Sequence, residues 1–173
     1  MFKKIYPLND FRSLFVVSIA IIALFWPSLI HSQPIPDSLL EYELPEQVNA
    51  QPGEAFETTI TLTIHEQWHI NSNPASMEFL IPTKIESVST GAVRLENVSY
   101  PDGESFQFEF VPRPISVYQD SVDLNMRFRV RSDYSGGAVK RPLKLTYQAC
   151  DDRRCLSPKT LTIDLLVNVS GSS

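Results

Sequence analysis

The chain has 173 residues, with 15 lysines and arginines against 20 aspartates and glutamates, so its net charge is −5 at pH 7. This length suits one domain with its own hydrophobic core. A hydrophobic content of 43% with only 6 glycines excludes a collagen and a disordered chain. The acidic balance argues against nucleic acid as a partner, because nucleic-acid binding needs a basic surface.

An export signal is predicted at residues 1–32. Three basic residues precede or adjoin the apolar run at 13–26, Pro27 ends that run, and the small residue Ser32 stands just before the expected cleavage point. An uncleaved anchor is the alternative, because the apolar stretch comes close to the ~18 residues that a membrane span needs. Cleavage would leave 12 basic and 19 acidic residues, a net charge of −7. A cysteine pair outside the cytosol is expected to be oxidised at rest.

Residues 33–40 are interpreted as a flexible lead-in and residues 41–170 as one domain. Apolar and polar residues alternate with period two, which predicts half-buried strands rather than helices. The clearest strands are expected at 56–65, 123–131, 142–149 and 160–169, and further strands at 39–44, 84–89, 93–100 and 106–111. Seven or eight short strands separated by turn residues predict an all-β fold, an immunoglobulin-like antiparallel β-sandwich.

The segment HEQWH, His65 to His69, matches the H-E-x-x-H pattern of zinc proteases. That pattern needs a helix, on which residues four apart lie one above the other and can share a zinc ion. Here the motif is expected to continue a strand, where four residues span about 13 Å. We therefore predict a strand end with His65 facing solvent, and no metal site.

Both cysteines lie near the C-terminus, in QACDDRRCLSP. Cys150 follows Ala149 of the expected strand 142–149, so it should lie on the polar face with Gln148, accessible or covered only by a loop. Cys155 comes just before the last strand, so the two cysteines bracket the loop of a hairpin. Facing strand ends bring Cα atoms within about 6 Å, which suits a disulfide.

The loop that such a disulfide closes is short. A six-residue loop gives about 2 kcal/mol in the chain-entropy model, against ~5–15 kcal/mol for a whole domain, so the core can keep its shape with the bond open. The flanking Arg153 and Arg154 would lower a thiol pKa, and Asp151 and Asp152 would raise it. From spacing alone, a static hairpin disulfide is favoured over a redox-active one, because exported domains usually use cysteines structurally.

The stretch LTYQACDDRRCLSP resembles the N-terminal periplasmic domain of the thiol:disulfide interchange protein DsbD. The matching residues are Tyr147, Gln148, Cys150, Cys155 and Pro158. Upstream, the segments 66–73, 80–85 and 110–128 are similar to that family's aromatic segment, the strand after it and the stretch that holds its cap loop. The resemblance covers residues 47–169, nearly the whole mature chain.

This resemblance implies an immunoglobulin-like sandwich whose cysteines cycle between dithiol and disulfide, without a metal or organic cofactor. The implied partners are a membrane-embedded DsbD- or CcdA-like electron donor and periplasmic clients of the thioredoxin fold, including disulfide isomerases and proteins of cytochrome c maturation. Cys155 is the implied attacking thiol and Cys150 the resolving one, through a mixed disulfide. The chain is expected to be periplasmic and monomeric.

The family also implies an aromatic cap that shields the cysteines from oxidants. Phe110 is the main candidate and Phe108 the next, while Trp68, Tyr147 and Gln148 are candidates for flanking the cysteines. Core packing is the alternative for the phenylalanines, because alternate residues there share one strand face. A buried core position is the alternative for Trp68.

Two departures from the family pattern bear on the role of the chain. Ser157 stands where many relatives have a proline, and the sequence shows neither the eight-helix membrane region nor the thioredoxin domain of full DsbD, so the donor is expected to be a separate protein. The resulting hypothesis is an exported thiol–disulfide exchange protein that works through Cys150 and Cys155. The alternative is a non-catalytic immunoglobulin-like interaction module with a static hairpin disulfide.

Overall fold

The computed structural model describes residues 38–109 and 111–171, and these form strands joined by loops and turns. The strands are β1 (Leu40–Glu43), β2 (Val48–Ala50), β3 (Ala55–Ile64), β4 (His69–Asn71), β5 (Lys84–Ser87), β6 (Val93–Ser99), β7 (Glu104–Phe106), β8 (Ile115–Tyr118), β9 (Ser121–Val130), β10 (Gly137–Tyr147), β11 (Ala149–Cys150) and β12 (Lys159–Val169).

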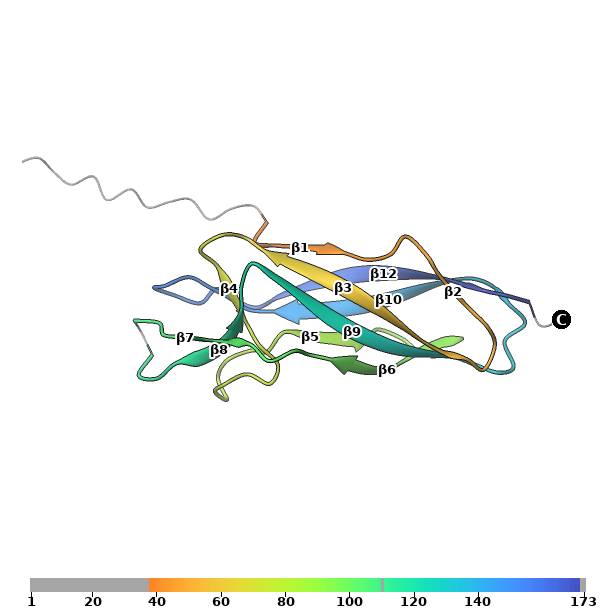
Figure 1. Ribbon diagram of the computed structural model, residues 1–173, viewed down its shortest axis with the longest axis horizontal. Coiled ribbons are helices and arrows are strands. Elements are labelled where there is room, and N and C mark those ends of the chain that lie inside the picture. The colour runs from red at the N-terminus through yellow and green to blue at the C-terminus, as the bar shows by residue number, and fades with distance from the viewer. Residues whose placement is uncertain (1–37, 110, 172–173) are drawn as a thin grey trace, which may run out of the picture. The chain divides into compact units, whose positions relative to one another are not determined.

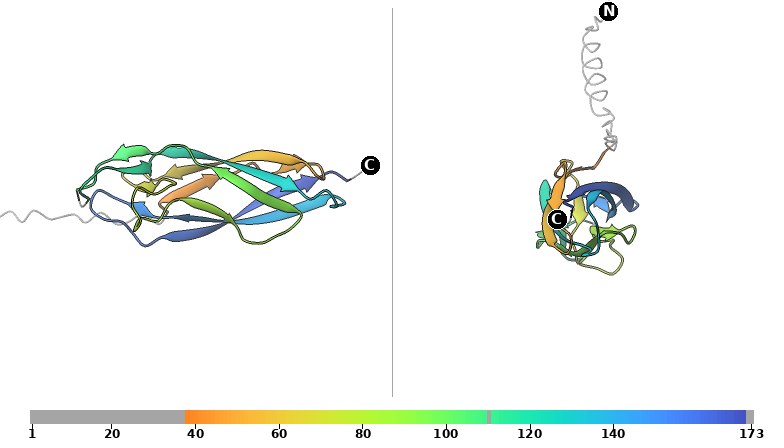
Figure 2. Two further views of the ribbon diagram at one scale, coloured as in Figure 1. Left: turned by 90° about the horizontal axis from the view of Figure 1, so that it is seen from below. Right: turned by 90° about the vertical axis from the view of Figure 1, so that its right-hand side faces the viewer.

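Two four-stranded sheets form the sandwich, with strand orders β1-β3-β9-β6 and β2-β12-β10-β5 (Figure 1). The long strands of both sheets run lengthwise through it (Figure 2). Neighbouring strands are antiparallel, except that β2 runs parallel to β12. The predicted all-β, immunoglobulin-like sandwich is confirmed.

The alternation of residue types explains why the long strands form. Side chains that point inward from β9 are all buried: Val122, Leu124, Met126, Phe128 and Val130. On the outer face of the same strand, Arg127 pairs with Glu57 at 3.0 Å and Arg129 with Glu96 at 2.6 Å. Apolar side chains of both sheets meet in one large cluster, which we call the main core.

A third, smaller sheet has the order β11-β4-β8-β7 and lies at one end of the sandwich (Figure 1). The long strands β3 and β10 each lead into it, through short connections to β4 and β11. The sequence did not predict this sheet as a unit, because strands of two to four residues are too short to show a period.

The predicted strand at 106–111 is wrong. Strand β7 ends at Phe106 and the chain then turns, because the Gln107 amide donates hydrogen bonds to the carbonyls of Phe108 (2.9 Å) and Val111 (2.8 Å). Two prolines follow within the next few residues and have no N–H for a strand ladder. The described residues of the 107–114 segment therefore form a loop over the third sheet.

The prediction that HEQWH continues a strand is also wrong. Strand β3 ends at Ile64, and the N–H of Trp68 donates to the carbonyl of His65 (3.0 Å), which closes a turn with Gln67 at a φ of 68°. His65 is exposed, as predicted, whereas His69 is buried and begins β4. Within the described ranges, no group of three or more histidine, cysteine, aspartate or glutamate residues could hold a metal ion.

The described part of the domain has buried residues almost from its start, directly after the exposed Ser38. Leu39 and Leu40, which the sequence interpretation assigned to the lead-in, are 2% and 4% exposed and belong to the main core. The predicted signal peptide at 1–32 lies outside the described residues. Among the residues that are described, no helix has the length and apolar character needed to cross a membrane.

Candidate functional site

The two cysteines form a disulfide that closes the tip of the hairpin between β10 and β12. The last paired residues of that hairpin are Tyr147 and Lys159. Beyond them, Cys150 and Cys155 face each other as an isolated antiparallel bridge, with their Cα atoms 4.0 Å apart. The predicted hairpin disulfide is confirmed.

The carboxylate of Asp151 organises the loop between the cysteines. Its Oδ1 accepts hydrogen bonds from the backbone N–H groups of Arg153 (2.9 Å) and Arg154 (2.8 Å), and its Oδ2 lies 3.4 Å from the Arg154 guanidinium. An aspartate that bonds the backbone two residues on is a common way to fix a tight turn. The Asp151 side chain thus fixes the conformation of the loop to which it belongs.

The sequence predicts that Cys150 is accessible or covered only by a loop. It is only 1% exposed, and it is covered both by loop residues such as Phe108 and by Ile115 and Val117 of β8. The chain leaves the β10 ladder at Gln148 and enters the third sheet, where Cys150 pairs with His69. That change of sheet turns the cysteine inward. Cys155 is partly exposed, so the two ends of the disulfide differ in access to solvent.

A small apolar cluster surrounds the disulfide, and we call it the cysteine cluster. Its buried members are Leu80, Phe108, Val111, Ile115, Val117 and Cys150, with Ala75, Met77, Phe106 and Cys155 packed against them as partly buried residues. It is separate from the main core. The disulfide therefore sits in a local apolar environment built from β8, β11 and two long loops.

Phe108 is 1% exposed in this cluster, and its ring centroid lies 4.7 Å from that of Phe106. It comes from the 107–114 loop, whose apolar side chains cover part of the cysteine cluster. Phe110, the main cap candidate, lies outside the described residues. Of the two cap candidates, Phe108 is thus the one placed with the cysteines.

Gln148 joins three segments beneath the disulfide. Its Oε1 accepts hydrogen bonds from Asn71 Nδ2 (3.0 Å) and from the N–H of Ile81 (3.1 Å), and its Nε2 donates to the carbonyl of Leu156 (3.1 Å). The cysteine-bearing hairpin is thereby tied to β4 and to the segment before β5. Gln148 supports the disulfide loop rather than covering the sulfurs.

The remaining two candidates lie elsewhere. Trp68 and Tyr147 are buried in the main core, at 8% and 3% exposure, and are not members of the cysteine cluster. Burial raises the pKa of the Tyr147 phenol. The structure therefore brings together Cys150, Cys155 and Phe108, with Gln148 alongside.

Sequence reasoning missed His69 as a neighbour of the cysteines. Its ring centroid lies 4.0 Å from that of Phe106 and 5.4 Å from that of Phe108. The only sequence signal that drew attention to it was the zinc-protease pattern, which concerns a different chemistry. His69 lies near the cysteines because β4 pairs with β11. His69 and its partner Cys150 are 81 positions apart in the sequence, a separation that no local pattern encodes.

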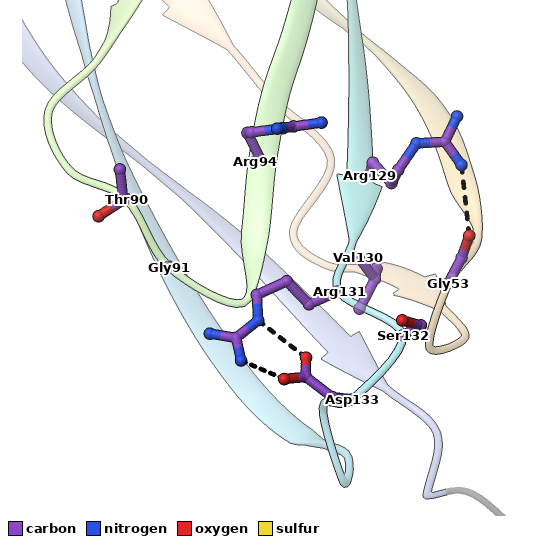
Figure 3. Close-up of a pocket in the computed structure, with 9 residues that line it drawn as sticks. All are labelled: Gly53, Thr90, Gly91, Arg94, Arg129, Val130, Arg131, Ser132 and Asp133. Carbon is purple, nitrogen blue, oxygen red and sulfur yellow. Dashed lines mark hydrogen bonds and ion pairs between the residues drawn. The ribbon is translucent and has the colours of Figure 1, made fainter.

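A hollow of about 820 Å³ lies at the start of β3 and the end of β9, lined in part by Arg94, Arg129 and Arg131 (Figure 3). Arg131 pairs there with Asp133, and Arg129 donates to the carbonyl of Gly53 (3.3 Å). Strand β3 runs from this hollow toward the third sheet over ten residues, or roughly 33 Å. The hollow is therefore remote from the disulfide.

The model of the family described as "Thiol:disulfide interchange protein DsbD, N-terminal" matches residues 37–167. The chain belongs to this family. A search of curated proteins gave no match. Membership of this family and the disulfide at its hairpin tip make the chain a thiol–disulfide exchange domain.

Among solved structures, the N-terminal periplasmic domain of ScsB from Proteus mirabilis is similar, with a TM-score of 0.53 and 11% sequence identity, over 77% of this chain and 49% of the other. The chain thus spans about half the length of that structure. A family 123 glycoside hydrolase from Clostridium perfringens matches with a TM-score of 0.38 and 12% identity, over 78% of this chain and 28% of the other. At these identities the likeness to ScsB shows the fold alone, and the hydrolase match carries no functional weight.

Proposed function

We propose that the chain is an exported electron carrier that reduces disulfides of thioredoxin-fold clients in the periplasm and is itself reduced by a membrane-embedded DsbD- or CcdA-like donor. The observation that carries the proposal is the unequal exposure of its bonded cysteines. Cys155 is open to solvent in part, and Cys150 is buried beside it. The Cys155 sulfur is available to a client, and the Cys150 sulfur lies close enough to attack Cys155 and so resolve the mixed disulfide.

The exchange takes two displacements. The Cys155 thiolate attacks one sulfur of the client disulfide, that disulfide breaks, and the second client sulfur leaves as a thiolate. Cys150 then attacks Cys155, the mixed disulfide breaks, and the first client sulfur leaves. The client gains two electrons and two protons, and the chain ends with its Cys150–Cys155 disulfide. A donor dithiol restores the reduced chain by the reverse sequence.

The proposal includes an aromatic cap over the cysteines. Phe108 is buried in the cysteine cluster, and Phe110, the other proposed cap residue, follows it two positions later in the sequence. Movement of this loop would open a path to the sulfurs for a client, while its closed position would exclude small oxidants. Trp68 is buried in the main core directly before β4, so its part in the proposal is to support the position of that strand and not to cover the sulfurs.

Cleavage of the signal at 1–32 and a monomeric state belong to the same proposal. A monomer is favoured because few large apolar side chains of the described surface are exposed: Tyr42, Phe79, Val88 and Leu166. These side chains lie singly on different elements, and scattered exposed apolar residues do not make an interface.

A redox titration followed by trapping tests the function. The wild-type disulfide should titrate with a potential above about −300 mV, the level below which structural disulfides typically lie. Cys150→Ser should form a mixed disulfide with a thioredoxin-fold protein through Cys155. The matched variant Cys155→Ser should form little, because its remaining thiol is buried.

A static disulfide is the competing function. It would show as a bond that resists reduction at that potential, or as equal failure of both serine variants to trap a client. Either result would leave an immunoglobulin-like interaction module in place of an electron carrier.

A further inference from the structure

His69 is a buried histidine with no role in the exchange described so far. Its side chain is 6% exposed, and its Nδ1 is buried without a hydrogen-bond partner among the described residues. Buried polar atoms without hydrogen-bond partners are rare in folded proteins, and one that does occur often has a functional role. The ring is held in place by Phe106 and Phe108, at centroid distances of 4.0 Å and 5.4 Å.

His69 lies directly opposite Cys150 in the antiparallel pairing of β4 with β11. Residues that face each other in this way have side chains on the same face of the sheet and Cβ atoms about 5 Å apart. Both side chains also meet the same phenylalanine-lined cluster. The imidazole is thus a neighbour of the resolving sulfur.

Reduction of the disulfide would supply a hydrogen-bond donor close to this unpartnered nitrogen. In the disulfide, the Cys150 sulfur carries no hydrogen and can donate nothing to Nδ1. Reduction adds a thiol S–H at that position, which is a hydrogen-bond donor. We propose that His69 Nδ1 accepts the proton of the Cys150 thiol and so activates this cysteine for the resolving step. The inference rests on the proposed function and adds a residue to it.

The Cys150 thiol transfers its proton to His69 Nδ1, and the resulting thiolate attacks Cys155 within the mixed disulfide. The Cys150–Cys155 bond forms, the bond from Cys155 to the client breaks, and the client sulfur leaves with the electron pair. The imidazolium then gives its proton to that departing thiolate or to water. His69 is unchanged at the end.

Other ionisable groups on the surrounding elements are placed less well for this task. They are Glu66, Glu78, Glu104, Glu109, Arg113, Tyr118, Asp120, Asp151, Asp152, Arg153 and Arg154. The Asp151 carboxylate is engaged by the backbone of its own loop, and the Tyr118 hydroxyl donates to the Pro101 carbonyl at 2.9 Å. The glutamates, the arginines, Asp120 and Asp152 are exposed. His69 is the buried one that pairs with Cys150.

The test follows the reduced protein as it reacts with 5,5′-dithiobis(2-nitrobenzoate). The first thionitrobenzoate released reports attack on the reagent, and the second reports closure by Cys150. His69→Phe keeps an aromatic ring against Phe106 and Phe108 but removes the nitrogen. His69→Asn retains an acceptor that does not titrate, and His65→Phe alters the exposed histidine of the same turn as a matched control.

In the wild type and in His65→Phe, closure should be fast at pH 7, because the imidazole of His69 takes up the Cys150 proton. In His69→Phe and His69→Asn, closure should be about tenfold slower at pH 7 and should keep rising toward the range of a free thiol, near pH ~8.5. The first release should change little, since a merely structural defect would alter both phases. Folding of each variant is checked by circular dichroism.

Equal closure rates and pH profiles in wild type and His69→Phe would overturn the role of His69 and leave the electron carrier intact. If the wild type itself fails to release the second thionitrobenzoate, the proposed function fails before His69 is tested. If His69→Phe does not fold, the comparison of His69→Asn with wild type decides by the same criterion.

Discussion

At the scale of single residues, the amide of Gln148 does more for the site than its place in the sequence indicates. It is a half-buried side chain whose oxygen and nitrogen are both bonded, to Asn71, to Ile81 and to Leu156. The carbonyl of the same residue accepts from the N–H of Asn71 at 3.4 Å. Gln148 therefore helps to fix the orientation of the cysteine-bearing hairpin over the third sheet, together with the pairing of β4 with β11.

Gln148→Ala should lower the free energy of unfolding by about 1–3 kcal/mol, because it leaves the Ile81 N–H and the Asn71 amide without their acceptor in a partly buried place. Urea denaturation with the disulfide intact measures the change. Gln47→Ala is the control, since Gln47 is exposed and bonds only Asn49 through its side chain in the described structure, at 3.3 Å; its effect should stay within about 0.5 kcal/mol. Equal effects of the two changes would contradict the bridging role.

At the scale of elements, the loop from 107 to 114 decides how exposed the disulfide is. It contributes Phe108 and Val111 to the cysteine cluster, and Gln107 holds its turn closed. The sequence placed a strand here because aromatic residues alternate at 106, 108 and 110. The alternation is real, but the two prolines and the Gln107 hydrogen bonds stop the ladder after Phe106, so the period alone misassigned the element.

Phe108→Ala should make the disulfide faster to reduce with dithiothreitol, because thiol–disulfide exchange depends on access to a sulfur. It should also cost about 3–5 kcal/mol of stability, as is usual for removal of a buried phenylalanine, so rates are compared where both proteins are folded. Phe79→Ala is the matched control. Phe79 is 69% exposed on a neighbouring loop, and its loss should leave the reduction rate unchanged. An unchanged rate in Phe108→Ala would remove the cap from the proposal.

At the scale of the whole molecule, the main core and the cysteine cluster are separate. The main core joins the two large sheets and includes neither cysteine. The disulfide closes a loop of six residues, from Cys150 to Cys155, with a sequence separation of 5. A domain built in this way can change the state of its disulfide without giving up its main source of stability.

Reduction should therefore lower the free energy of unfolding by only about 2 kcal/mol and leave the sandwich folded. Circular dichroism and urea denaturation, with and without dithiothreitol, measure this. The Cys150→Ser/Cys155→Ser double variant serves as a control for side effects of the reductant. Unfolding of the reduced protein at room temperature would show that the disulfide is a structural requirement, and an electron carrier could not work in that way.

The sequence by itself determined the long strands, the inward faces of β3, β9, β10 and β12, and the disulfide at the hairpin tip. These features follow from local periodicity and from the short spacing of the two cysteines. Both are properties of residues close together in the sequence and do not depend on the rest of the chain. The motif around Cys150 and Cys155 also carried enough of the family pattern to place the chain in it.

Only the tertiary structure decided the burial of Cys150, the cysteine cluster and the position of His69. Each depends on the third sheet, in which β4 and β11 pair across a long stretch of sequence and present strands of two or three residues. Strands this short show no period in the sequence. They pair because β3 and β10, which belong to the two large sheets, end close together and lead into β4 and β11. The thiol–disulfide exchange proposed for this chain depends on that non-local pairing, which buries Cys150 beneath apolar side chains and leaves Cys155 partly exposed to solvent.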